Sequence, residues 1–205
     1  DDAAGEMLKH ISEQQGVQIY TGVSIASIDS EDNVTGVTLA DGRTFPAELV
    51  IVSAGVRANT VLAKTAGIEV DRAVIVNSKM EPDIYACGDC AQYDGLNYAI
   101  WPEASEQGKV AGANAAGEEM EYETVPAALS FHGMRTALFA AGDNGKNPNL
   151  VYKTIELKDM GKKQYQKYYF LNNRLCGVIL IGDVSRMAEM TQALEEHVQY
   201  QELKL

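Results

Sequence analysis

The stretch Ile84-Tyr85-Ala86-Cys87-Gly88-Asp89 decides the fold, because it predicts an apolar strand that ends directly at a glycine and a carboxylate. Upstream, the run Leu49-Val50-Ile51-Val52 leads into Ser53-Ala54-Gly55-Val56. A run that is apolar at every position is typical of a strand covered on both faces. Downstream, a helix is predicted from Pro102 to Gly117, since proline suits a first helical turn. Strands and helices in this order predict an α/β fold.

Each of these parts suits binding of a dinucleotide. Gly55 and Gly88, at predicted strand ends, let backbone approach a ligand more closely than any Cβ would permit. Asp89 offers an acceptor for sugar hydroxyls. The beginning of the 102–117 helix presents free N–H groups and a positive dipole end, which favours developing negative charge.

Residues 49–117 resemble the second flavin-contacting segment of the pyridine nucleotide–disulfide oxidoreductase superfamily. Within them, Ala99-Ile100-Trp101-Pro102-Glu103-Ala104 is similar to the helix that points at the isoalloxazine ring. The most similar subgroup comprises NADH:rubredoxin reductases and the flavin modules of assimilatory nitrite reductases. Its C-terminal domain resembles residues 133–143 and 175–183.

The resemblance implies a role for individual residues. Asp89, beside Gly88, would hydrogen-bond the ribityl chain of FAD. The backbone at Trp101, Pro102 and Glu103 would face the N1/C2 carbonyl edge of the flavin, where the helix terminus stabilises the anionic reduced form. No catalytic acid is expected at Glu103, because hydride transfer to flavin does not require one there.

Gly55 and Val56 would sit beside the nicotinamide nucleotide, according to the same resemblance. Their segment follows the family pattern Ala-Gly-Val-Arg-Xaa-Asn, except that Ala58 stands where the family commonly has proline. That departure loosens the turn without touching the chemistry. No catalytic residue and no metal ligand is assigned in this chain.

The family implies FAD and NAD(P)H as cofactors, with hydride passing from NAD(P)H to FAD and electrons going on to an acceptor such as rubredoxin or a nitrite reductase centre. Two glycine-rich strand-to-helix loops are needed for these cofactors, and neither occurs here. We therefore expect a C-terminal fragment that is inactive alone and does not retain FAD. The alternatives are a non-catalytic dimerisation or partner-docking module and a flavoprotein-derived scaffold.

Three domains are expected from these boundaries. Residues 1–47 would be the remainder of an NAD(P)-binding domain, and residues 48–120 the C-terminal segment of an FAD-binding domain. Residues 121–205 would form a small α+β domain for dimerisation or docking. The acidic, proline-containing segment 118–126 is the best candidate for the internal boundary.

Hydrophobic periodicity and turn signals place the remaining elements. We expect strands at residues 17–20, 23–30, 34–39, 44–45, 49–52, 74–76, 84–86, 136–141, 151–157, 164–171 and 175–181, and helices at 3–15, 61–66, 102–117 and 185–200. Asp41-Gly42 is a strong hairpin signal, and Asn172-Asn173 predicts the turn between the last two strands.

Composition excludes several classes of protein. The 205 residues are 46% hydrophobic and 22% charged, which argues against disorder. A net charge of −12 repels nucleic acid and anionic lipid. No apolar run approaches the roughly 20 residues of a membrane span, and no secretory signal opens the chain. Small molecules, proteins and a second copy in a homodimer remain as partners, in a reducing cytoplasm.

Three further groups of residues each allow two interpretations. Cys87 and Cys90 have the spacing of a redox or zinc pair, but a structural role is favoured, as it is for Cys176 in a strand. His132 and Arg135 are placed on the surface or in packing rather than beside the flavin. Trp101 would either stack near the flavin or shield the helix start.

A cluster of cations lies in the predicted C-terminal domain. Lys163 and Lys167 are expected on one face of the strand at residues 163–171. Lysines of this kind either guard a strand against edge pairing or form a docking site for a small acidic electron carrier such as rubredoxin. Nearby cations belong to the same cluster: Lys158, Lys162 and Arg174.

Overall fold

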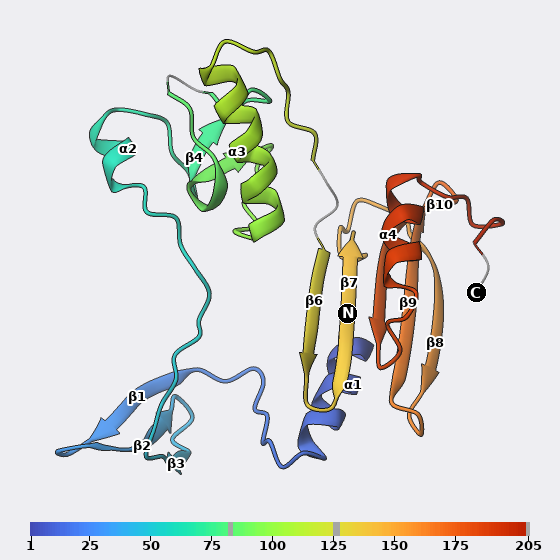
Figure 1. Cartoon of the computed structure of the whole chain (residues 1–205). Helices are drawn as coiled ribbons and strands as arrows, with labels where there is room; N and C mark the ends of the chain where they lie inside the picture. Colours follow the sequence, from blue (N-terminus) through green and yellow to red (C-terminus); the bar gives the residue numbers. More distant parts are fainter. Residues whose placement is uncertain (82–83, 125–127, 204–205) are drawn as a thin grey trace. The chain divides into compact units, whose positions relative to one another are not determined.

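The computed structural model describes residues 1–81, 84–124 and 128–203 (Figure 1). They form two compact units, residues 9–55 and residues 1–8 with 56–205. The mixed α/β class expected from the sequence is confirmed. Among the described residues, no helix is long and apolar enough to cross a membrane. The elements are α1 (Asp2–Glu13), β1 (Ile25–Ser30), β2 (Val34–Leu39), β3 (Thr44–Pro46), α2 (Val61–Thr65), β4 (Val74–Val76), η1 (Gly88–Cys90), β5 (Ala91–Tyr93), α3 (Trp101–Ala115), β6 (Ala128–Gly133), β7 (Thr136–Gly142), β8 (Lys153–Asp159), β9 (Gln164–Leu171), β10 (Arg174–Ile181) and α4 (Met187–Glu195).

The 9–55 unit contains an antiparallel meander of β1, β2 and β3. Its second turn is formed at Asp41-Gly42, where Gly42 has a φ of 87°, a conformation that glycine adopts without steric cost. The guanidinium of Arg43 donates to Asp41 Oδ2 at 2.7 Å and steadies the turn. All three strands of the meander were predicted.

The segment that precedes and includes α3 has its own core. β4 and β5 pair in parallel, with Val74 opposite Ala91 and Val76 opposite Tyr93. The buried residues that join these strands to α3 are Ile68, Val74, Val76, Met80, Ala86, Ala91, Val110, Ala111 and Tyr122. This core fixes α3 against the two short strands, so that the helix and the 88–90 turn are held together.

The C-terminal domain is a five-stranded antiparallel sheet in the order β6-β7-β10-β9-β8, with α4 along one face (Figure 1). Asn172 and Asn173, at φ 50° and 63°, form the predicted turn between β9 and β10. The core between sheet and helix contains Phe139, Ala141, Tyr168, Phe170, Leu175, Val178, Leu180, Met190, Ala193 and Leu194. Strand β6 was not predicted, and in the structure its residues are exposed on both faces up to His132.

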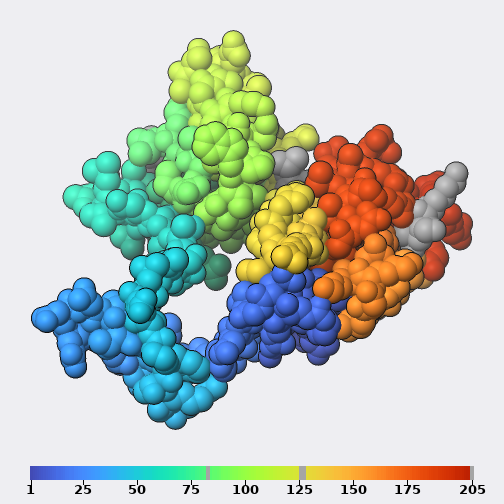
Figure 2. All heavy atoms as spheres, turned by 60° about the horizontal axis from the view of Figure 1, so that its bottom comes forward, coloured from blue at the N-terminus to red at the C-terminus, as the bar shows by residue number. Residues whose placement is uncertain are grey.

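The opposite face of the same sheet receives the beginning of α1, as Figure 2 shows for the dark blue and orange residues. The Asp1 carboxylate caps α1 by accepting a bond from Ala4 N at 2.9 Å. It also accepts bonds from Tyr165 Oη at 2.9 Å and Tyr169 Oη at 2.7 Å. Lys167 Nζ lies 2.7 Å from this carboxylate. A polar cluster therefore joins α1 to the sheet.

Three predicted strands are wrong. Residues 17–20, 49–52 and 84–86 form no strand, and the side chain of Ile51 is 81% exposed. An apolar run becomes a strand only when neighbouring strands satisfy its backbone groups, and no described strand pairs with any of these runs. The parallel partner of β4 is β5, seven residues after Ile84.

The terminal helix is also shorter than the predicted 185–200. α4 ends at Glu195, and His197 has a φ of 50°, which turns the chain out of the helix. The tail then returns to the sheet, where Gln199 forms a bridge with Arg174. The helix therefore ends where the chain turns back to the sheet. The residues that it meets there, such as Arg174, are distant in sequence, so the helix pattern alone did not predict this end.

Lys167, at the centre of the predicted cation cluster, does not guard a strand edge. Strand β9 lies between β10 and β8, so Lys167 cannot guard an edge. Its ammonium group is also shared between Asp1 and Glu156, the second at 3.1 Å. On the true edge strand β8, Lys158 pairs with Glu6 at 3.8 Å. The predicted exposed face of Lys163 and Lys167 is therefore absent.

Replacing Lys167 with methionine should destabilise the chain by about 2–3 kcal/mol, because two carboxylates lose their shared cation in a mostly buried position. Lys167 and Asp1 side chains are only 18% and 15% exposed. Urea unfolding of the two proteins measures the difference. The matched control is Lys162→Met, since Lys162 is exposed and should change stability by less than about 0.5 kcal/mol.

The ion pair of Lys167 with Glu156 makes the stability difference between wild type and Lys167→Met depend on pH. Hydrogen bonding from Lys167 lowers the pKa of Glu156, so the contribution is present above the ordinary carboxyl pKa and is lost as pH falls through the lowered one. The gap between wild type and Lys167→Met should therefore shrink below about pH 4. A gap that stays constant as the pH falls well below about 4 would contradict the ion-pair origin.

Candidate functional site

The Gly88–Asp89 turn packs directly against α3. Gly88 has a φ of 72°, and a Cβ placed there would lie 3.3 Å from the Cβ of Ala104. Gly88 N donates to Oε1 of Gln107 at 2.7 Å, and Gln107 is only 1% exposed. Glycine is thus required twice at this position, for the left-handed backbone and for the close approach to the helix.

The first turn of α3 presents free backbone donors. The N-cap residue Ile100 is extended, with φ −124° and ψ 149°, and no side chain caps the helix. Pro102 lies in the first turn, where its missing N–H costs nothing. Trp101 is 86% exposed at the same end. An uncapped helix N-terminus of this length attracts negative charge.

Glu103 points back from this turn into the protein and is only 8% exposed. Its Oε2 accepts a bond from Tyr98 N at 3.2 Å, and its Oε1 accepts one from the Tyr122 hydroxyl at 3.4 Å. Burial raises the pKa of Glu103, and the nearby charge of Asp89 adds to that rise. Burial and the Glu103 charge raise the pKa of Tyr122 to about 12.

Asp89 keeps an exposed carboxylate beside the helix start. The hydrogen bond recorded at this residue uses its backbone carbonyl, which accepts from Nδ2 of Asn97 at 3.0 Å. Within the described part of the chain, no partner is recorded for the carboxylate itself. It is therefore available to a hydroxyl of a bound molecule.

The structure brings five of the seven predicted site residues to one place. They are Gly88, Asp89, Trp101, Pro102 and Glu103. Gly55 and Val56 are described in separate units, and both lie in an exposed stretch without regular secondary structure. Gly55 has a φ of 85°, which explains the glycine. The assignment of this pair to the nicotinamide nucleotide stays a prediction.

Three residues of the site were missed in the sequence: Asn97, Gln107 and Tyr122. Gln107 carried a signal, because it follows Glu103 by four residues and so shares its helix face. A polar pair on the otherwise apolar face of a helix indicates buried hydrogen bonds. Asn97 and Tyr122 carried no local signal, since their partners are defined by folding.

The cysteines show no sign of a site. All three are free, and the described residues contain no group of three or more side chains that could hold a metal ion. Cys90 is exposed, and its thiol donates to the Cys87 carbonyl at 3.3 Å. Burial raises the pKa of Cys176 to about 11, as befits an inert thiol. His132 and Arg135 are exposed in the β6–β7 hairpin.

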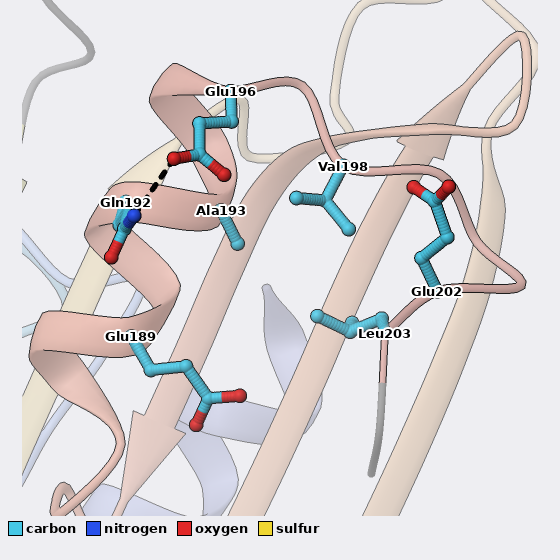
Figure 3. A pocket seen from close by; sticks show the side chains of 7 residues that line it. All are labelled: Glu189, Gln192, Ala193, Glu196, Val198, Glu202 and Leu203. Carbon is cyan, nitrogen blue, oxygen red and sulfur yellow. Dashed lines mark hydrogen bonds between the residues drawn. The ribbon is translucent and has the colours of Figure 1, made fainter.

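A hollow of about 270 Å³ lies beside α4 and is lined by acidic and apolar side chains (Figure 3). Its wall carries Glu189, Glu196 and Glu202, and its floor carries apolar side chains such as Val198. Gln192 donates to Glu196 at 2.7 Å along the same side of this hollow. The three carboxylates among its described lining residues would repel an anionic cofactor.

Comparison with protein families gives two matches. Residues 1–108 match the pyridine nucleotide-disulphide oxidoreductase family, and residues 127–198 match the rubredoxin NAD+ reductase C-terminal domain. The chain therefore belongs to the pyridine nucleotide-disulphide oxidoreductase family, whose members depend on FAD and NAD(P)H. It combines that fold with a C-terminal domain of the rubredoxin reductase kind.

Curated relatives agree with this membership. The chain is 33% identical over 189 residues to nitrite reductase [NAD(P)H] of Bacillus subtilis, covering 90% of this chain and 23% of the relative. It is 29% identical over 201 residues to NADH-rubredoxin oxidoreductase of Clostridium acetobutylicum, covering 95% and 48%. The chain thus spans from about a quarter to about half of these relatives.

Solved structures confirm the fold. The putidaredoxin reductase–putidaredoxin complex matches with a TM-score of 0.80 at 23% identity, covering 96% of this chain and 49% of that one. A NAD-dependent persulfide reductase from A. fulgidus matches with a TM-score of 0.87 at 23% identity, covering 100% and 43%.

Alanine at Gly88 should destabilise the chain more than alanine at Gly95. Both glycines have positive φ, 72° and 75°, but a Cβ at Gly95 meets nothing within 4 Å. Gly95→Ala therefore measures backbone strain alone, about 1–2 kcal/mol. Gly88→Ala adds the contact with Ala104 and should cost about 1 kcal/mol more. Equal losses in urea unfolding would show that the approach to α3 is not tight.

Proposed function

We propose that this chain is the flavin-facing C-terminal part of a longer FAD-dependent reductase. That protein would transfer hydride from NAD(P)H to FAD and pass electrons to an acceptor such as rubredoxin or a nitrite reductase centre. The observation that carries this proposal is the junction of the Gly88–Asp89 turn with the uncapped start of α3. The names of the curated relatives support both types of acceptor.

The residues present at the junction fit FAD. The exposed carboxylate of Asp89 would accept a bond from a ribityl hydroxyl. The free amides at Trp101 and Glu103 would face the N1/C2 carbonyl edge of the flavin and stabilise negative charge that develops there. When bound, FAD supplies the hydride-accepting chemistry, and the protein supplies binding, orientation and electrostatics.

The glycine at position 88 is what allows this arrangement. Its close contact with α3 keeps the Asp89 carboxylate and the helix amides at a fixed separation, because the Gln107 bond restrains both. Pre-organised donors of this kind need no rearrangement as charge develops. In the same proposal, Gly55 and Val56 would lie beside the nicotinamide nucleotide.

Exposed apolar residues support the inference that more chain is needed. Leu49, Ile51 and Val52 are each more than 70% exposed, although their pattern is that of a strand covered on both faces. A parallel sheet supplied by further sequence would cover them and complete the nucleotide-binding domain. The cofactor phosphate loops would lie in that sequence.

A second candidate function is favoured by the edge strand β6. Leu129 and Phe131 lie exposed on one face of this strand, and Met134 is exposed at its hairpin turn. Exposed apolar residues on an open edge are typical of pairing with another chain. This is the dimerisation or docking module of the alternative interpretation. It would replace the reductase proposal if the longer protein bound no FAD.

The 205-residue chain alone should purify without colour, because FAD affinity in such folds depends on contacts to the pyrophosphate. The loops that make those contacts are absent from the sequence. Visible absorption after gel filtration, with and without added FAD, measures retention. Stoichiometric flavin on the isolated chain would overturn the expectation.

In the longer protein, Asp89→Ala should weaken FAD binding by about 2- to 12-fold, the equivalent of one hydrogen bond of 0.5–1.5 kcal/mol. Asp89→Asn keeps an acceptor oxygen and should lose less. Flavin content after dialysis and the Kd from fluorescence quenching give the two values. Wild-type affinity in Asp89→Ala would remove Asp89 from the site.

A further inference from the structure

The loop between β5 and α3, residues 94–100, holds a costly conformation beside the site. Asp94 and Ala99 have φ values of 48° and 52°, in the left-handed region. For alanine this costs roughly 1–2 kcal/mol, and such strain persists only where the surroundings impose it. The loop therefore needs restraints that offset this cost.

Asn97 provides the first restraint. Its Nδ2 donates to the carbonyl of Asp89 at 3.0 Å and to the carbonyl of Ala91 at 2.6 Å. One side chain thus ties the middle of the loop to the turn that carries Asp89. The loop cannot move away without leaving both carbonyls to find other donors.

Glu103 provides the second restraint, from the helix side. It is the third residue of α3, and in capping boxes a glutamate at this position reaches back to a backbone N–H before the helix. Here the carboxylate reaches Tyr98 N, two residues ahead of the N-cap residue. Its other oxygen accepts from Tyr122, which follows the helix. Glu103 therefore clamps both flanks of α3 to its first turn.

We propose that Asn97 and Glu103 are positioning residues that hold the 94–100 loop between the Gly88–Asp89 turn and α3, so that Trp101 and the α3 amides face the flavin. The clamp itself follows from the hydrogen bonds of this chain. Its effect on flavin rests on the proposed function. Both act here through their side chains, which bind protein groups, whereas the part of Glu103 that would face the flavin is its backbone amide.

The Glu103 clamp responds to pH. The titratable groups that face Glu103 are Asp89 of η1, Tyr98 of the loop and Tyr122 of the segment after α3. An ionised carboxylate accepts from both Tyr98 N and Tyr122 Oη, whereas a protonated one turns one oxygen into a donor. Burial raises the pKa of Glu103, so this exchange occurs above the range of an exposed glutamate.

Nuclear magnetic resonance of the 205-residue chain tests the clamp without any cofactor. The Tyr98 amide reports the bond to Glu103, and Trp101 is the sole tryptophan, so its indole N–H gives a single resonance at the helix start. In wild type, both resonances should titrate together with one pKa above that of an exposed glutamate. Slow hydrogen exchange should protect the Tyr98 amide.

Three variants separate positioning from mere support. Glu103→Gln keeps an acceptor for Tyr98 N, so protection should persist while the titration disappears. Glu103→Ala should lose the titration and lower Tyr98 protection by about ten-fold. Asn97→Ala should lower protection in the loop but leave the titration. Glu106→Gln, one turn along α3 and paired with Lys109, is the matched control and should behave as wild type.

A Tyr98 amide that titrates equally in wild type and Glu103→Gln would overturn the proposal, as would unchanged protection in Glu103→Ala. The longer protein then tests the effect on cofactor. There, Glu103→Ala and Asn97→Ala should each raise the FAD Kd by about two- to ten-fold relative to Glu106→Gln. An unchanged Kd with a confirmed clamp would refute the flavin part. Absence of FAD from the wild-type protein would refute the proposed function instead and leave the clamp standing.

Discussion

The hydrogen bond from Gly88 N to Gln107 Oε1 is the interaction on which the candidate site depends. Its acceptor is buried, so loss of the donor would leave a polar atom without water or partner, at a cost of about 1–3 kcal/mol. The bond joins the turn that carries Asp89 to helix α3. Gln107 lies about one helical turn after the first residues of that helix. The bonds of Asn97 and Glu103 then hold the loop beside this turn and this helix.

Around this bond, the site is assembled from short segments rather than from one rigid sheet. Strands β4 and β5 have three residues each, and their single parallel pairing cannot hold a loop by itself. Side chains do so instead. Asn97, Glu103 and Gln107 each satisfy backbone groups of a neighbouring segment, which stabilises an irregular stretch that would otherwise sample many conformations.

The C-terminal domain follows a different physical plan. Its central strands carry α4 on one face, over an apolar core, and the beginning of α1 on the other, where a polar cluster joins helix and sheet. The ion pair of Lys167 with Asp1 works only because two tyrosine hydroxyls complete the hydrogen bonds of the carboxylate. Without those donors, the desolvation of two charges would outweigh their attraction. Lys167, predicted from the sequence as part of a docking or edge-guarding cluster, thus has a structural role.

The sequence by itself determined the family, the Gly88–Asp89 turn, the meander, the Asn172-Asn173 hairpin and the beginning and end of α3. These features depend on residues within a few positions of each other, so local propensity and spacing predict them. Only the tertiary structure decided that residues 49–52 stay unpaired, that β9 lies inside its sheet, and that Asn97 and Glu103 hold one loop. The contact between Asp1 and Tyr165 spans 164 positions, and no local pattern records such a pairing. A side chain's partner at that distance is chosen by packing, because burial and the satisfaction of polar groups are settled only when the whole domain has folded.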